Sequence, residues 1–252
     1  MVVGKHCMNL LKHCLIPDWP APKNVRALQT TRNGGISAPP YDSLNLGDHV
    51  GDAPLAVARN RMLLSPLLPS EPVWLRQVHG TEVIDAAQAA CWPQADACIS
   101  TQPEAVCAVM TADCLPLLLC DDAGSVVGAA HAGWRGLCDG VIEQTVRAMQ
   151  VPPYTLMAWL GPAIGPQSFE VGDEVRTAFI AVQPQAVTAF TAGASGKWLA
   201  DIYQLARQRL NALGITRIYG GNLCTYTDRA RFFSYRRDGV TGRMGTFIWL
   251  ER

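Results

Sequence analysis

The sequence lacks a net charge of either sign, because 21 Lys and Arg residues balance 21 Asp and Glu residues in a chain of 252. A protein that holds a nucleic-acid backbone usually carries a basic excess, so we expect no nucleic-acid partner. The longest apolar runs fall well short of the roughly 20 residues that a spanning helix needs, so we expect no membrane partner. The amino-terminal residues also lack a small-residue cleavage site. Together these absences predict a cytoplasmic location.

The chain has no Cys-x-x-Cys pair, which excludes a zinc ribbon and a thioredoxin-like redox site. It also has no Walker A loop and no Gly-x-Gly-x-x-Gly fingerprint. An odd number of cysteines, several of them inside apolar runs, is typical of buried free thiols in a reducing compartment. The nine cysteines are Cys7, Cys14, Cys91, Cys98, Cys107, Cys114, Cys120, Cys138 and Cys224.

The composition is that of a globular protein, with 49% hydrophobic and 17% charged residues. Residues 1–24, which contain Pro17, Pro20 and Pro22, are predicted to be a flexible lead-in, and residues 25–252 a single catalytic domain. Strand-like runs outnumber helical ones without strict alternation, which predicts an α/β fold with mixed sheets. The pattern predicts strands at 25–32, 73–78, 82–86, 95–100, 105–110, 115–120, 125–130, 155–160, 217–219, 231–235 and 246–250, and helices at 54–68, 139–149, 172–182 and 198–213.

Three residues with metal-binding side chains follow strand-like runs: His79, Cys114 and His131. Two imidazoles and one thiolate suit zinc, and three protein ligands leave a fourth position open, as in catalytic sites. Their wide separation matches no local zinc motif, so a purely structural role for each residue stays open. Asp113 precedes Cys114 and is predicted either to orient a ligand or to accept hydrogen bonds from turn amides.

Other residues are candidates for binding an anionic or polar ligand. Gly133-Trp134-Arg135-Gly136 precedes a predicted helix. The unpaired backbone N–H groups at the start of that helix and the guanidinium group of Arg135 could hold an anion. The run 229–237 places arginines beside aromatic residues, which fits either a pocket for an anionic or ring-bearing ligand or a solvated strand edge with a buried Phe-Phe pair. The polar loops at 30–37 and 44–47 are typical places for binding residues.

These motifs together resemble those of one family, and they run in order from about residue 25 to the carboxyl terminus. It is the bacterial laccase-domain family, called multicopper polyphenol oxidase, zinc-dependent purine nucleoside phosphorylase and adenosine deaminase, or peptidoglycan editing factor. The strings that carry the resemblance are Thr31-Arg32-Asn33-Gly34-Gly35-Ile36-Ser37, Leu44-Asn45-Leu46-Gly47, Gln77-Val78-His79-Gly80, Thr111-Ala112-Asp113-Cys114-Leu115-Pro116, Ala130-His131-Ala132-Gly133-Trp134-Arg135-Gly136, Gly161-Pro162-Ala163-Ile164-Gly165 and Phe233-Ser234-Tyr235-Arg236-Arg237-Asp238-Gly239.

The resemblance implies a layered α/β/β/α sandwich similar to the catalytic domain of cytotoxic necrotising factor. It implies that His79, Cys114 and His131 are the metal ligands and the catalytic centre, with zinc as the metal and copper as an alternative. The implied activities are phosphorolysis of purine nucleosides, including methylthioadenosine, and deamination of adenosine. The implied partners are therefore a nucleoside and phosphate. We assign Arg32, Arg135 and Arg236 to phosphate, and Ser37 and Asn45 to the nucleoside, as hypotheses.

Three alternatives remain. A polyphenol oxidase with several coppers would need on the order of ten histidines, because even a single type 1 copper takes two, and this chain has five histidines in all. A Cys–His hydrolase that acts in peptidoglycan editing would use Cys114 as its nucleophile. A binding or regulatory protein would hold the metal as a structural element. The sequence does not indicate the oligomeric state.

Overall fold

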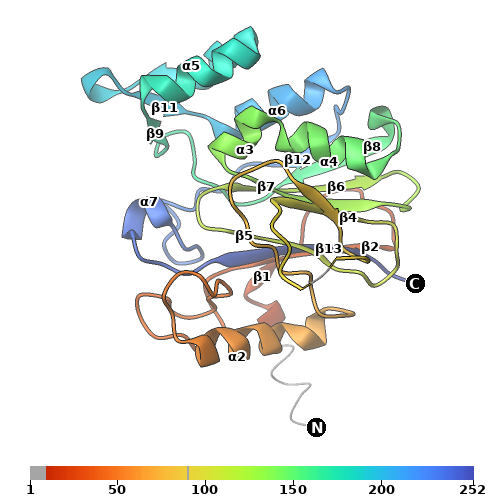
Figure 1. The fold of residues 1–252 in the computed structure, drawn as a ribbon. Helices are drawn as coiled ribbons and strands as arrows, with labels where there is room; N and C mark the ends of the chain where they lie inside the picture. The colour runs from red at the N-terminus through yellow and green to blue at the C-terminus, as the bar shows by residue number, and fades with distance from the viewer. Residues whose placement is uncertain (1–9, 90) are drawn as a thin grey trace.

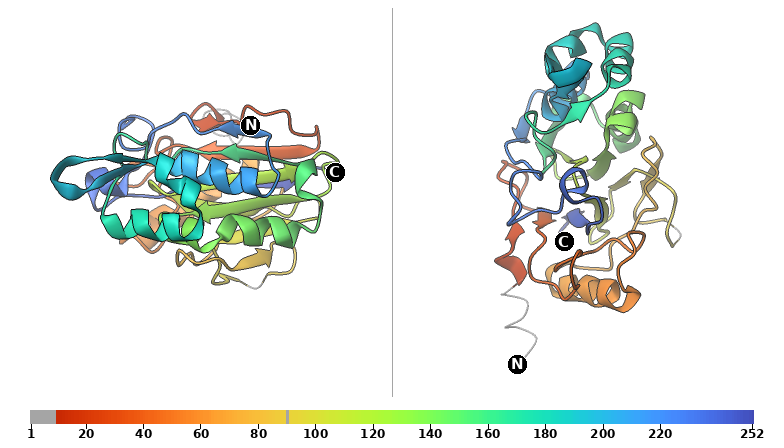
Figure 2. Two further views of the ribbon diagram at one scale, coloured as in Figure 1. Left: turned by 90° about the horizontal axis from the view of Figure 1, so that it is seen from above. Right: turned by 90° about the vertical axis from the view of Figure 1, so that its left-hand side faces the viewer.

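The computed structural model describes residues 10–89 and 91–252, which form a mixed α/β fold with four layers (Figure 1). A six-stranded sheet and a four-stranded sheet lie face to face. Helices cover the outer face of the larger sheet, and one helix covers the outer face of the smaller sheet. Figure 2 shows the same layers from above and from the side. The predicted α/β class with strands of mixed direction is confirmed, and the similarity to cytotoxic necrotising factor stays a prediction.

The larger sheet has the order β12-β8-β6-β7-β4-β3 and is mixed, because β12 with β8 and β3 with β4 are parallel pairs while the other pairs are antiparallel. Its central strand β6 is buried along its whole length. Such a continuous apolar run is typical of a strand that is covered on both faces. The strands are β3 (Val83–Asp85), β4 (Ala97–Ser100), β6 (Leu115–Asp121), β7 (Val127–Ala132), β8 (Leu156–Leu160) and β12 (Ile218–Gly220).

The smaller sheet has the order β1-β2-β13-β5 and is antiparallel throughout. Its strands are β1 (Cys14–Leu15), β2 (Val25–Thr30), β5 (Cys107–Thr111) and β13 (Met244–Leu250). Strand β1 and buried Leu10 lie inside the predicted lead-in, so the expectation of a loose segment does not hold from Leu10 to Leu15, where β1 extends the edge of β2. Residues 1–9 of that lead-in lie outside the described residues. The division into a lead-in and a single catalytic domain stays a prediction.

Apolar clusters on the two faces of each sheet hold the layers together, and strand alternation explains them, because successive side chains point to opposite faces. Leu118 and Cys120 of β6 point between the sheets, where they pack with Val109 of β5 and Ile248 of β13. Leu117 and its alternating neighbours point to the other face, against the covering helices. The helices on this side are α3 (Trp134–Asp139), α4 (Val141–Met149), α5 (Asp173–Val182) and α6 (Ile202–Ala212). The outer face of the smaller sheet packs against α2 (Pro54–Leu64).

Short elements complete the described chain. A three-stranded antiparallel sheet, β10-β11-β9, lies beside α5, and the helix α7 lies near the start of β13 (Figure 1). Their bounds are β9 (Glu170–Val171), β10 (Phe190–Ala192), β11 (Trp198–Ala200) and α7 (Tyr235–Asp238), and the 3-10 turns are η1 (Ser65–Leu67), η2 (Pro153–Thr155), η3 (Pro184–Ala189) and η4 (Ala194–Gly196).

Three predicted elements differ most from the structure. The helix predicted at 198–213 begins only at Ile202, because the Asp201 carboxylate accepts the Gln204 amide and caps it, while Trp198–Ala200 forms a strand. The strand predicted at 231–235 is absent, and α7 begins there instead, capped by Ser234. The strand predicted at 73–78 is reduced to isolated bridges at Val73 and Arg76. No described helix is long and apolar enough to cross a bilayer.

A candidate metal centre at one end of the larger sheet

His79, Cys114 and His131 meet at the end of the larger sheet where β3, β4 and β6 begin and β7 ends. Their ligand atoms all lie within 4.8 Å of one another, and Cys114 Sγ lies 3.8 Å from His79 Nε2. Ligands bonded at about 2.0–2.3 Å to one tetrahedral zinc lie roughly 3.3–3.5 Å apart, so small side-chain movements suffice to bring all three atoms onto one ion. The donor set and its geometry therefore fit a single metal ion.

The three residues of this cluster lie on different kinds of backbone structure: a strand, a connection between the two sheets and a tight turn. His131 is the penultimate residue of β7 and is almost fully buried. Cys114 lies in the short connection that carries the chain from β5 in one sheet to β6 in the other, directly after Asp113 with its φ of +91°. His79 occupies a corner with a φ of +62° and is exposed. A non-glycine residue with positive φ is uncommon and is often found at functional sites.

Asp96 connects two parts of the cluster. Its carboxylate lies 2.7 Å from His131 Nδ1 and accepts hydrogen bonds from the amides of Val78, His79 and Gly80. The side chain is fully buried. No motif of the sequence indicates this residue. The one available signal was an acid at the start of an otherwise apolar strand.

Asp113 does not orient a ligand of the cluster. Its carboxylate accepts hydrogen bonds from the Thr225 hydroxyl, at 2.6 Å, and from the Arg236 amide, at 2.6 Å. This second bond holds the first turn of α7 beside the cluster. Of the two roles predicted for Asp113, the structure therefore supports the acceptor of backbone and hydroxyl donors.

Cys114 and His131 form a charged pair when no metal is bound. Burial raises the pKa of the Cys114 thiol, but the His131 charge and hydrogen bonds from both histidines lower it more, to about 6. Burial lowers the pKa of His131, but the Cys114 thiolate and Asp96 raise it more, to about 9. Between these values the thiolate and the imidazolium coexist. A thiolate is the form of cysteine that binds metals and attacks carbon.

Two cavities open onto the cluster, and both are lined by His79, Cys114 and Tyr235. The smaller, of about 230 Å³, is also lined by Arg135 and Arg236. The larger, of about 420 Å³, is lined on its other sides by His131, His49, Gln77, Met110, Thr111 and Arg243. The Thr111 hydroxyl is buried and has no hydrogen-bond partner among the described residues. A buried polar group without a partner is costly, so this hydroxyl is suited to a polar ligand or a water.

The structure brings two of the five predicted ligand-binding residues to these cavities. Arg135 and Arg236 line the smaller one. Arg32, Ser37 and Asn45 line neither, because their polar groups are used inside the protein. The Arg32 side chain bonds Asp42 and lies over Phe233, the Ser37 hydroxyl donates to Asp52, and the Asn45 side-chain oxygen accepts the Arg243 amide.

The glycines of the predicted anion loop have a packing role. A Cβ atom at Gly133 would lie 2.7 Å from His79 Cδ2 and 3.0 Å from Cys114 Sγ, and one at Gly136 would lie 2.7 Å from the Gly80 carbonyl oxygen. Both glycines therefore let α3 approach the His79 corner. In the run 229–237, Phe232 and Phe233 are fully buried, while Tyr235 and Arg236 reach the cavities of the cluster.

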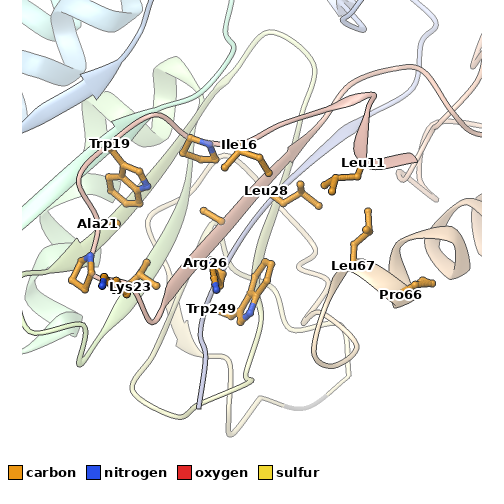
Figure 3. Close-up of a pocket in the computed structure, with 14 residues that line it drawn as sticks. Leu11, Ile16, Trp19, Ala21, Lys23, Arg26, Leu28, Pro66, Leu67 and Trp249 are labelled. Carbon is orange, nitrogen blue, oxygen red and sulfur yellow. The ribbon is translucent and has the colours of Figure 1, made fainter. Parts of the chain in front are cut away.

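A further cavity, larger than these two, lies elsewhere, along β2 of the smaller sheet (Figure 3). It measures about 560 Å³ and is lined by apolar side chains such as Trp19, Leu28 and Trp249, together with the cations Lys23 and Arg26. It contains no histidine, cysteine or acidic side chain. Since general acid–base and metal chemistry need such groups, the three-residue cluster is the better candidate for a reaction centre.

Comparisons with known proteins identify the family of the chain. The sequence model of a family described as multi-copper polyphenol oxidoreductase laccase matches residues 26–251. A protein of Escherichia coli K12 named purine nucleoside phosphorylase YfiH is 57% identical over 239 residues, covering 94% of this chain and 98% of the relative. A Streptomyces coelicolor protein also named purine nucleoside phosphorylase is 40% identical over 233 residues, covering 88% and 94%. The crystal structure of Neisseria meningitidis protein NMB0706 matches with a TM-score of 0.93 and 54% identity, covering 95% of this chain and all of that one.

Proposed function

The chain belongs to the multi-copper polyphenol oxidoreductase laccase family, and we propose that it is a metal-dependent purine nucleoside phosphorylase. One observation carries the proposal: the cluster of two histidines and one cysteine lies between two cavities that share its side chains. A phosphorylase must bring two substrates to one point, and this arrangement offers one cavity for each. The names of the relatives supply the substrate class.

The metal that we propose is zinc, bound by His79, Cys114 and His131. When bound, it would supply Lewis acidity and stabilise negative charge at its open position. Copper is the alternative, since two histidines and a cysteine also form mononuclear copper sites. A multicopper centre is disfavoured, because in residues 10–89 and 91–252 only this one group of three metal-binding side chains occurs.

The two cavities suggest separate binding positions for phosphate and nucleoside. Arg135 and Arg236 place two guanidinium groups along the smaller cavity, and guanidinium forks match phosphate oxygens. The larger cavity offers Thr111 and Arg243 as polar contacts for a nucleoside. In phosphorolysis a phosphate oxygen attacks ribose C1′ while the bond to the purine nitrogen breaks, and the purine nitrogen takes up a proton. Cations fixed near the reacting groups lower the barrier, because they need no reorganisation as charge develops.

We extend the proposal to two finer activities, phosphorolysis of methylthioadenosine and deamination of adenosine. Both use a purine nucleoside in the larger cavity. In deamination water would attack purine C6 and ammonia would leave, whereas in phosphorolysis phosphate attacks ribose C1′ and the purine leaves. The two reactions would compete for the same nucleoside.

A Cys–His hydrolase acting in peptidoglycan editing is the second candidate. It is favoured by the 3.8 Å separation of Cys114 Sγ and His79 Nε2 and by the lowered pKa of the thiol. The two candidates differ in what they do with the sulfur atom. A thiolate that is bound to a metal is withheld from attack on an acyl carbon, whereas a nucleophilic thiolate must be free.

The test is metal analysis of the purified protein together with turnover of adenosine, inosine and methylthioadenosine, with and without phosphate. We expect about one zinc per chain, phosphate-dependent release of the free base, and loss of both metal and turnover in His79→Ala and Cys114→Ala. Cys91→Ala is the matched control, because Cys91 is exposed and lies outside the cluster. Phosphate-dependent turnover that persists in both cluster variants would show that the reaction occurs elsewhere. Metal-free protein that hydrolyses acyl substrates would favour the hydrolase.

A further inference from the structure

We propose that Asp96 is a positioning residue that holds two of the three metal ligands, His79 and His131, in a fixed relation to each other. The inference rests on the proposed metal site and deepens it. Asp96 is not one of the three clustered ligands, and its side chain is fully buried. Four donors nevertheless converge on its two oxygens, all within 3.1 Å.

The first half of this arrangement fixes the His79 corner. The Asp96 oxygens accept the amides of three successive residues, at 3.1 Å from Val78, 2.9 Å from His79 and 2.7 Å from Gly80. Successive amides that point to one anion form a nest, which requires a turn of alternating handedness. The φ of +62° at His79 supplies that turn, although it is unfavourable for a residue with a side chain. The buried carboxylate therefore stabilises a backbone conformation that presents the His79 ring to Cys114.

The second half fixes the His131 ring. Asp96 Oδ1 lies 2.7 Å from His131 Nδ1, so a proton on this nitrogen is held by the carboxylate and Nε2 faces the cluster. A carboxylate behind a histidine ligand sets its tautomer and its orientation. The pairing of β4 with β7 places the two residues opposite each other, and the His131 amide donates to the Asp96 carbonyl oxygen at 2.7 Å. The carboxylate is thus anchored to the same strand pair that carries the ligand.

One side chain therefore serves two ligands that come from different segments. Gln77 provides an independent anchor for the same corner, because its side-chain amide donates to the Met110 carbonyl and accepts the Met110 amide. This bond pair ties the corner to β5, but it does not reach the His131 ring. Asp96 is the residue whose loss would release both rings at once.

The test compares Asp96→Asn with Asp121→Asn. Asparagine keeps the volume of the side chain, but its amide nitrogen cannot accept hydrogen bonds, so at least one of the four donors loses its partner. Asp121 is a matched control at the opposite end of β6, because its buried carboxylate accepts the Ser125 and Val126 amides and the Ser125 hydroxyl, away from the cluster. Zinc affinity is measured by competition with a chelator of known affinity. We expect Asp96→Asn to reduce the zinc affinity by about 10–100-fold. We expect Asp121→Asn to reduce the zinc affinity by no more than about 2-fold, although it lowers thermal stability to a similar extent.

A second measurement leaves Asp96 unchanged and so does not depend on the variant folding. Nitrogen-15 NMR of the zinc-loaded, histidine-labelled protein reports the state of each His131 ring nitrogen. We expect a proton on Nδ1 and ligation through Nε2, and ligation through Nδ1 would overturn the inference. Equal zinc affinity of Asp96→Asn and the unmodified protein would also overturn it, provided that His79→Ala has lost the metal. If His79→Ala keeps the metal too, the proposed site itself is wrong.

Discussion

At the scale of single residues, Gly133 shows how closely the chain must approach the candidate metal centre. It caps the amino-terminal end of α3 and lies where a Cβ atom would be 2.7 Å from the His79 ring and 3.0 Å from the Cys114 sulfur. The φ of Gly133 is −64°, so an alanine would not be strained by its backbone angles. Any effect of a side chain there must come from contact with the ligands.

We expect Gly133→Ala to reduce zinc affinity by at least 10-fold, because the added methyl group displaces two ligands at once. The fold should be retained at a cost of about 1–3 kcal/mol, as for other overpacked sites. Gly128→Ala in β7 is the control, because its Cβ would meet no atom closer than 3.3 Å. The measurement is chelator competition with chemical denaturation in parallel. Unchanged zinc affinity in Gly133→Ala would contradict the cluster geometry.

The lowered pKa of Cys114 predicts how the metal-free protein reacts with pH. A thiol with a pKa of about 6 is a thiolate at neutral pH and loses that charge as the pH falls through 6. We therefore expect the rate of Cys114 alkylation by iodoacetamide to be half-maximal near pH 6 in protein stripped of metal. Peptide mass spectrometry at a series of pH values measures it, with Cys114→Ala to identify the peptide. Saturating zinc should suppress the reaction. A half-maximal rate near pH 9 would mean that His131 does not act on the thiol.

At this scale the sequence predicts the residues whose side chains have a specific chemistry. His79, Cys114 and His131 could be proposed because few side chains offer nitrogen or sulfur ligands. Asp96 was missed, because an acid is recognisable as a partner only once the pairing of β4 with β7 is known. Asn45 was assigned to the nucleoside, yet it accepts the Arg243 amide and so supports a residue that lines the larger cavity. A polar loop in a sequence does not reveal which of its groups are already paired.

At the scale of elements, α7 brings Tyr235 and Arg236 to the cavities, and Asp113 holds it there. The Asp113 carboxylate is itself fixed by the Thr225 hydroxyl, at 2.6 Å, and Thr225 is fully buried. This chain of contacts connects the crossover between the two sheets to the helix that completes the site. Loosening it should affect substrate binding more than metal binding.

We expect Thr225→Val to raise the KM for phosphate several-fold while the zinc content stays at the level of the unmodified protein. Valine keeps the shape of threonine but leaves one Asp113 oxygen without its donor, which costs about 1–3 kcal/mol in stability. Steady-state kinetics at saturating nucleoside, urea denaturation and metal analysis give the three readouts. Thr177→Val is the control, since the Thr177 hydroxyl lies on the exposed side of α5. Loss of zinc in Thr225→Val would show that Asp113 supports the ligands after all.

Element boundaries were predicted where local signals are strong and missed where capping decides. The buried strands β6 and β8 agree with their predicted ranges to within one residue, because continuous apolar runs specify them. In contrast, the helix predicted to begin at Trp198 begins only after Asp201, which caps it. The apolar spacing of Trp198 and Leu199 fits a helix, but these residues lie before the cap. The run at 231–235 has the aromatic content of a strand, but Ser234 caps a helix there. Apolar periodicity alone therefore does not predict where a helix begins when one capping side chain sets its first residue.

At the scale of the whole molecule, the two stacked sheets explain why distant residues meet. The α/β class could be predicted, because apolar runs without strict alternation exclude a doubly wound sheet. The order of the strands could not, since β13 pairs with both β2 and β5 and thereby joins the two ends of the chain to its middle. Cys114 lies at the crossover between the sheets, while His131 and Asp96 lie in or beside neighbouring strands of one sheet. The site is therefore a product of the sandwich and not of any one motif.

This architecture predicts that metal binding stabilises the whole fold. The three ligands come from separate segments, so an ion bound to the folded protein alone adds about 4 kcal/mol at a free concentration 1,000-fold above its Kd. A chain of this size shifts its Tm by roughly 2–4 °C per kcal/mol. We therefore expect chelation to lower the Tm of the zinc-loaded protein by roughly 10 °C in differential scanning calorimetry. The same treatment should leave the Tm of His79→Ala unchanged, because that variant has no site to empty. Equal Tm values for the unmodified protein with and without chelator would mean that no tightly bound ion joins these segments.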